Sequence, residues 1–148
     1  VITRDPDAGG EIHDGVSEAE FEMLKQAGKF AVSWEAHGLR YGIPVETREA
    51  VEKGRLVVAN GSRSALPLFR AAFPSLVVVN VTARPEVLAS RLEARGRESR
   101  QDILQRLERG GIGVCGDYPV VTIDNSGSLD QSGAAMIDVL SNCLTAKA

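Results

Sequence analysis

The chain has 148 residues, of which 43% are hydrophobic and 25% are charged, and its formal net charge is −3. This composition is that of a globular protein, and the length suffices for one domain with a sizeable core. The negative charge argues against a nucleic-acid or membrane-surface partner, and no apolar run reaches the roughly 20 residues that cross a bilayer. Cys115 and Cys143 are far apart, so we expect two reduced thiols in a cytoplasmic protein.

The expected elements alternate between helices and short apolar strands. Residues 1–3 look like part of a strand, and Ser17 with Glu20 predicts a capping box at the start of a helix that ends at Gly28. Further along, the patterns predict strands at 56–59, 76–81 and 120–123, and helices at 47–53, 65–73, from Pro85, around 103–107 and over 130–144. Continuously apolar strands alternating with helices predict a parallel sheet covered on both faces.

Residues 5–45 are less regular, and we expect them to form an insertion over the edge of the sheet. Within them, segment 35–42 brings an acid, an imidazole, a guanidinium and a phenol together between glycines. Gly38 and Gly42 permit tight turns, so the segment could expose Arg40 and Tyr41 to an anionic ligand. The alternative is a polar hairpin whose Tyr41 packs on the core.

Arginines gather in the second half of the chain, at Arg84, Arg91, Arg95, Arg97, Arg100, Arg106 and Arg109. A guanidinium offers a fixed fork of donors that matches phosphate oxygens. Three of them, Arg91, Arg95 and Arg106, flank a glycine-containing break between two helices, which suggests a flap that closes over a polyphosphate. The alternative is a solvated helix face on which the arginines pair with neighbouring acids.

Two polar segments follow predicted strands, which is where α/β sheets bind ligands. One is Thr3-Arg4, and the other is Asp124-Asn125-Ser126-Gly127. By contrast, His13 and His37 lack the spacing of metal ligands, so no protein-held metal is expected. No nucleophile elbow is present either.

Taken in order, these segments resemble the guanylate-kinase family. The resemblance covers most of the chain and rests on Thr3-Arg4, Gly10-Glu11, Val16 to Phe21, Gly28-Lys29-Phe30, His37 to Gly42, Arg91 to Gly96, and Arg106-Leu107. It implies a P-loop kinase fold, a three-layer α/β arrangement with a parallel sheet. It also implies a phosphotransferase that uses ATP, with Mg²⁺ as the family's expected metal.

Within this family, segments 1–11 and 37–44 are most similar to the kinases that phosphorylate ribose 1,5-bisphosphate in bacterial phosphonate breakdown. Three departures from guanylate kinases favour this sugar phosphate over GMP. Val32 and Gly61 stand where guanylate kinases carry acids that read the base, and Asp7 stands in place of a second phosphate-binding arginine. A base-free acceptor needs no base-reading acid.

The resemblance also implies roles for individual residues. Arg4 and Tyr41 would hold the acceptor's phosphate, in a substrate-binding group that includes Glu35, His37, Arg40 and Gly42. Arg91, Arg95 and Arg106 would stabilise charge on the transferring phosphoryl group, and Asn125 would lie near the adenine. Positioning and charge neutralisation are most of what phosphoryl transfer requires.

The family's phosphate loop, Gly-x-x-x-x-Gly-Lys-[Ser/Thr], does not occur in these 148 residues. We therefore expect 1–148 to be a single incomplete kinase domain that lacks the first strand and this loop and is inactive alone. Its parts would be an acceptor-binding insertion at 5–45 and an arginine-bearing lid at 91–106. The alternatives are a divergent nucleoside monophosphate kinase and a catalytically inactive guanylate-kinase-like binding module, against which the lid arginines argue.

Overall fold

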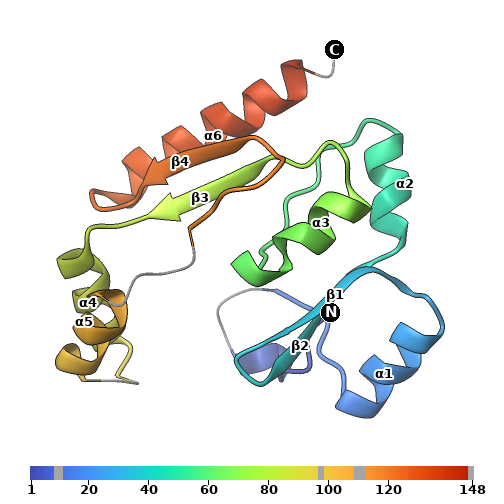
Figure 1. Cartoon of the computed structure of the whole chain (residues 1–148), viewed down its shortest axis with the longest axis horizontal. Coiled ribbons are helices and arrows are strands. Elements are labelled where there is room, and N and C mark those ends of the chain that lie inside the picture. The colour runs from blue at the N-terminus through green and yellow to red at the C-terminus, as the bar shows by residue number, and fades with distance from the viewer. Residues whose placement is uncertain (9–11, 97–98, 109–112, 147–148) are drawn as a thin grey trace. The chain divides into compact units, whose positions relative to one another are not determined.

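The computed structural model describes residues 1–8, 12–96, 99–108 and 113–146. Several residues used above, namely Gly10, Glu11, Arg97 and Arg109, lie outside this part. The described chain divides into two compact units, Val1–Leu76 and Val77–Ala148. We refer to them as unit 1 and unit 2 and treat each by itself (Figure 1).

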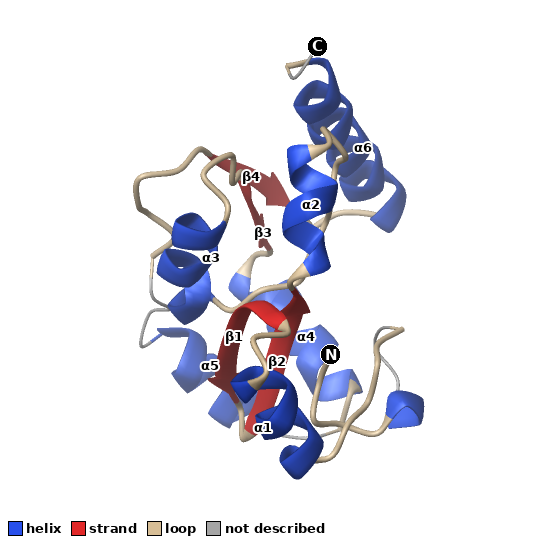
Figure 2. Ribbon diagram, turned by 90° about the vertical axis from the view of Figure 1, so that its right-hand side faces the viewer, coloured by secondary structure: helices blue, strands red, loops and turns tan. Residues whose placement is uncertain are grey.

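Unit 1 is built on an antiparallel hairpin of β1 (Phe30–Ala36) and β2 (Leu39–Pro44). Between the strands, His37 and Gly38 have φ values of 54° and 73°. Positive φ at both central residues is what a two-residue type I′ hairpin turn requires. The hairpin alternative predicted from the sequence is therefore what the backbone adopts (Figure 2). The helical elements of unit 1 are η1 (Pro6–Ala8), α1 (Glu18–Gln26), α2 (Glu46–Glu52), η2 (Arg63–Ala65) and α3 (Leu66–Ala72).

The start of α1 confirms the predicted capping box. The Ser17 hydroxyl accepts from the Glu20 amide at 3.2 Å, and the Glu20 carboxylate accepts from the Ser17 amide at 2.8 Å. These two bonds satisfy amides that the first helical turn leaves without partners. The amide and the hydroxyl of Ser17 both donate to the Glu20 carboxylate at 2.8 Å, which holds the pKa of the Glu20 carboxyl below its ordinary value of 4.5. The helix ends at Gln26, just before Gly28, whose φ is 68°.

The first residues run beside the hairpin without forming a full strand. Ile2 makes isolated bridges to Gly15 and Tyr41. The terminal ammonium of Val1 donates to the carbonyl of Gly42, whose own amide donates back to the Val1 carbonyl at 2.9 Å. The predicted strand at 1–3 is thus reduced to a short pairing with the outer edge of β2.

The core of unit 1 lies between one face of the hairpin and α3. Its buried members are Val32, Ala65, Phe69 and Phe73, with Ala31, Trp34, Ile43, Val51, Ala72 and Leu76 packed around them. Because side chains alternate along a strand, Val32 and Trp34 face this core while Ser33 and Glu35 face the other way.

Unit 2 pairs β3 (Val78–Thr82) with β4 (Val120–Asp124) in parallel, as predicted. Three helices complete it, α4 (Pro85–Ala94), α5 (Arg100–Glu108) and α6 (Leu129–Thr145). The helix α6 packs on β4, and α4 packs on α5 (Figure 1). Two fully buried side chains, Ala89 of α4 and Ile103 of α5, show where these helices face inward. Pro85 occupies the first helical turn, as the sequence indicated.

The predicted strand at 56–59 is wrong. These residues form no strand, and Val57 and Val58 are 42% and 67% exposed. A strand forms only where its backbone groups find partners, and no segment in the described part of the chain pairs with 56–59. The strands of the hairpin were not predicted in full, because residues 5–45 were expected to be less regular, although Phe30, Val32 and Trp34 alternate with polar or small residues.

Candidate functional site

Arg4 of unit 1 has buried hydrogen-bond donors without partners in the described part of the chain. Its Nε and Nη2 are buried, and no hydrogen-bond partner for them exists among the described residues. Burying a charged donor without an acceptor is costly. A guanidinium in this state can bind an anion, and phosphate oxygens match its fork of donors.

The position of Arg4 is set by the residue before it. Thr3 pairs with β2, because its amide donates to the Arg40 carbonyl at 3.0 Å and its Oγ1 accepts from the Arg40 amide at 2.8 Å. On the other side, the His13 ring lies 3.3 Å from the Arg4 carbonyl, measured from Nε2. The Arg4 backbone is thus held between β2 and the segment that precedes α1.

Tyr41 lies on the core face of the hairpin. Its ring stacks on its cross-strand partner Trp34, with centroids 5.2 Å apart and planes at 8°. Trp34 in turn contacts Phe69 of α3, at 5.2 Å and 58°. This stack fixes the ring of Tyr41, whose predicted contact with the acceptor's phosphate stays a prediction.

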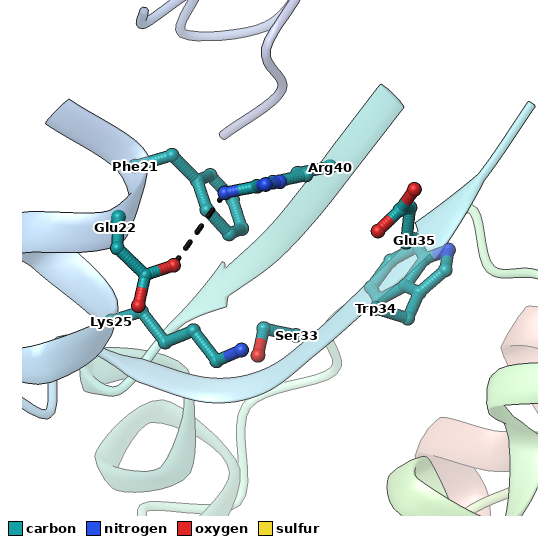
Figure 3. Close-up of a pocket in the computed structure, with 7 residues that line it drawn as sticks. All are labelled: Phe21, Glu22, Lys25, Ser33, Trp34, Glu35 and Arg40. Atoms are coloured by element: carbon teal, nitrogen blue, oxygen red, sulfur yellow. Dashed lines mark ion pairs between the residues drawn. The ribbon is translucent and has the colours of Figure 1, made fainter. Parts of the chain in front are cut away.

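Glu35 and Arg40 lie on the opposite face of the hairpin from Tyr41, because neighbouring residues of a strand alternate. They line a cavity of about 220 Å³ with Phe21, Glu22, Lys25 and Ser33, and Trp34, which also packs on the core, completes the lining (Figure 3). Arg40 points across it to Glu22 of α1, with Nη1 3.5 Å from Oε2. The structure therefore does not gather the predicted substrate-binding residues on one surface.

The two remaining members of that predicted group, His37 and Gly42, shape the backbone of the hairpin. His37 is exposed in the hairpin turn. At Gly42, a Cβ would lie 2.5 Å from the Phe30 ring. Because that ring also stacks on Phe21 at 4.7 Å, Gly42 lets the aromatic pair lie against β2.

In unit 2, the arginines divide between bonded and exposed positions. Arg91 donates from Nη1 to the Asn125 carbonyl at 2.6 Å and from Nη2 to the Gly127 carbonyl at 3.4 Å. Arg100 pairs with Glu93 at 3.6 Å, as the solvated-face alternative predicted. Arg95 is exposed at the end of α4, and the side chain of Arg106 in α5 lies outside the described part.

The segment after β4 is held by a network of hydrogen bonds to β3, to α6 and within the segment itself. Asn125 donates its amide to the Thr82 carbonyl at 2.6 Å, and its Oδ1 accepts from the Ser132 hydroxyl at 2.8 Å. The Asp124 carboxylate accepts from the hydroxyl and the amide of Ser126, which lowers the pKa of Asp124. Sequence reasoning missed Ser132, a buried hydroxyl in α6. Its signal was a polar residue on the helix face shared with Ala135, Met136 and Val139.

Within the described ranges, no group of three potential ligands is placed to hold a metal ion. None of the helices in these ranges has both the length and the apolar character needed to span a membrane.

No protein-family model matches the chain. Over 140 residues it is 60% identical to the ribose 1,5-bisphosphate phosphokinase PhnN of Agrobacterium fabrum, covering 95% of this chain and 76% of that protein. Over 144 residues it is 58% identical to the protein of the same name from Rhizobium etli, with coverages of 97% and 73%.

Among solved structures, a guanylate kinase from Anaplasma phagocytophilum matches with a TM-score of 0.68 at 19% sequence identity. The match covers 95% of this chain and 71% of that one. It confirms the predicted guanylate-kinase-like α/β fold with a parallel sheet.

Proposed function

This chain belongs to the ribose 1,5-bisphosphate phosphokinase family, and we propose that it is a kinase for that sugar phosphate. In the proposed reaction, a phosphoryl group passes from ATP to ribose 1,5-bisphosphate, giving ADP and 5-phosphoribosyl 1-pyrophosphate. The reaction would serve phosphonate breakdown in the cytoplasm, where ATP is available. The identity of 60% to a protein named as a kinase favours this enzyme over the inactive binding module.

The observation that carries the proposal is the half-buried side chain of Arg4, whose Nε and Nη2 are buried and lack partners in the described chain. Ribose 1,5-bisphosphate carries two phosphates and no base, so its binding depends on cationic donors. Arg4 would pair with one of these phosphates and so recover the hydrogen bonds that the free protein lacks. Its backbone is already fixed beside β2, which lowers the cost of positioning the donors.

The surroundings of positions 32 and 61 support a sugar over a nucleotide. Val32 is 4% exposed and belongs to the same buried cluster as Phe69. A Cβ at Gly61 would lie 3.3 Å from the Phe69 ring. Hydrocarbon therefore occupies the neighbourhood in which the resemblance predicted base-reading acids. A base placed there would lose the hydrogen bonds of its polar edge. Such a loss would strongly disfavour a nucleotide relative to a base-free sugar phosphate.

The nucleotide side of the reaction is assigned to unit 2. Asn125 would contact the adenine. Because its Oδ1 already accepts from Ser132, it would offer its two amide donors. Arg95 and Arg106 would neutralise charge on the transferring group. Kinases generally carry Mg²⁺ on the nucleotide's phosphates with few protein ligands, and we propose the same here.

A coupled assay that detects ADP tests the proposal on the full-length gene product. We expect kcat/KM with ribose 1,5-bisphosphate to exceed that with GMP by at least about 100-fold. Ribose 5-phosphate serves as the matched control, since it has the same sugar but only one phosphate. Faster turnover of GMP would contradict the proposal and favour the nucleoside monophosphate kinase.

A further inference from the structure

The loop 125–127 in unit 2 is fixed from three elements. The Asn125 amide is bonded to Thr82 at the end of β3, and its carboxamide oxygen to Ser132 of α6. From the start of α4, the Arg84 amide donates to the Ser126 hydroxyl at 2.7 Å. These partners are neutral groups: a backbone carbonyl, a hydroxyl and a backbone amide.

Arg91 is the one contributor to this network that reaches the loop through a long, charged side chain. It lies in the last turn of α4, and its two terminal nitrogens contact the carbonyls of Asn125 and Gly127. The two carbonyls flank Ser126, so a single guanidinium spans the whole loop. A planar fork of donors can bridge two acceptors at once, whereas a lysine ammonium acts as a point charge.

This geometry differs from what a lid arginine requires. A residue that neutralises a transferring phosphoryl group must aim its donors at that group. In Arg91, one donor of each terminal nitrogen already points to a backbone carbonyl of its own unit, and the contact with Asn125 is short, at 2.6 Å. Turning the guanidinium away to face a phosphate would break both bonds to the loop.

We propose that Arg91 is a positioning residue for the nucleotide site: it holds the loop 125–127 so that the Asn125 carboxamide stays aimed at the base. The inference rests on the proposed function, in which Asn125 contacts the nucleotide. Arg91 thus affects the affinity for ATP through the loop 125–127. Other arginines neutralise the charge on the transferring phosphoryl group.

The test compares Arg91→Ala, Arg91→Lys and the wild type in the full-length protein. A matched control is Arg48→Ala, because Arg48 is also exposed and donates to a backbone carbonyl, that of Ala31 at 3.4 Å, but lies in unit 1. For Arg91→Ala we expect about a 10-fold rise in the KM for ATP, with kcat and the KM for the sugar phosphate little changed. Arg91→Lys recovers part of the affinity, and Arg48→Ala matches the wild type.

Two further measurements do not depend on the acceptor. Hydrogen exchange of the peptide that contains 124–128 becomes about 10-fold faster in Arg91→Ala, because the loop loses its bridge. Binding of a fluorescent ATP analogue weakens in parallel. If kcat falls 100-fold while the exchange and the KM for ATP stay unchanged, Arg91 acts on the phosphoryl group and the inference is wrong.

Unchanged exchange together with unchanged ATP binding overturns it as well. If the wild type does not phosphorylate ribose 1,5-bisphosphate, the proposed function fails, but the exchange and the analogue binding still decide the role of Arg91.

Discussion

Unit 1 and unit 2 each contain an arginine that the sequence singled out, and the two side chains are in opposite states. Arg4 of unit 1 has two buried guanidinium nitrogens without partners in the described chain. Arg91 of unit 2 is exposed, and both of its terminal nitrogens donate to carbonyls of its own unit. Residue type and family resemblance assigned both to phosphates. Of the two, only Arg4 has donors left without partners, and we propose a ligand for Arg4 alone.

The difference shows how a buried group reveals a binding site. A protein tolerates an unsatisfied buried donor only where something else compensates the cost, and a bound anion is one such compensation. An exposed arginine carries no such cost, because water satisfies it. Its function must therefore be inferred from the partners it has. Mutations that separate ligand binding from stability in each unit test this difference.

The largest expected effect is on the scaffold that supports the hairpin. Phe21 of α1 is 2% exposed and stacks on Phe30. Replacing it in Phe21→Ala leaves a cavity, so we expect the free energy of unfolding of unit 1 to fall by about 3–5 kcal/mol. Met23→Ala on the same helix is the control, since Met23 is 65% exposed and should change stability by less than about 0.5 kcal/mol. Urea unfolding measures both, and equal effects would contradict the burial of Phe21.

The next effect contrasts the two arginines directly. Arg4→Met keeps much of the aliphatic stem and removes the unsatisfied donors. We expect the free energy of unfolding to stay constant or to rise by about 1 kcal/mol. Arg91→Met loses two donated bonds and should destabilise unit 2 by about 1 kcal/mol. Urea unfolding without ligand checks both signs, and a clear loss of stability in Arg4→Met would show that Arg4 has a structural partner.

The smallest effect concerns the caps of two helices, one in each unit. Ser17 caps α1 with Glu20 in return, whereas Ser128 caps α6 by accepting from the Gln131 amide at 3.3 Å. Each serine-to-alanine change should cost about 1 kcal/mol at pH 7. The pKa of Glu20 is lowered in the folded state. Its stabilising contribution is therefore present above the unfolded pKa and is lost as the pH falls through the folded one.

The two variants should accordingly differ in pH dependence. Below pH 4.5 the cost of Ser17→Ala shrinks, because the bond from the Ser17 hydroxyl to the Glu20 carboxylate weakens as Glu20 becomes protonated. The cost of Ser128→Ala stays constant, because Gln131 does not titrate. Thermal unfolding followed between pH 7 and pH 3 measures this difference. Parallel pH profiles for the two variants would contradict the capping box.

Local signals in the sequence predicted most of the elements. The capping box of Ser17 and Glu20, Pro85 in a first helical turn and the glycines after α1 and α2 each act within a few residues, so the sequence carries them completely. Pairing depends on distant segments and was harder to predict. Residues 56–59 are apolar enough for a strand, yet no described segment offers them a partner, and they form none.

For the candidate site, the sequence indicated residues by their type but could not indicate their contacts. The sequence singled out Arg4, Tyr41, Arg91 and Asn125. It could not show that Tyr41 and Arg40 face opposite sides of a hairpin, because that follows from the turn at His37 and Gly38. Nor could it show that Glu22, one helix away, pairs with Arg40. Such contacts arise between elements, where no short motif records them.

The most direct measurement of the central claim is a calorimetric titration of ribose 1,5-bisphosphate into the full-length wild type, Arg4→Met and Arg55→Met. Arg55 is an exposed arginine of the same unit, so its variant controls for the loss of one positive charge. We predict that Arg4→Met weakens binding by about 10- to 100-fold through lost charge-assisted hydrogen bonds, while Arg55→Met binds like the wild type. Equal affinity in all three proteins would contradict the assignment of Arg4 to the acceptor's phosphate.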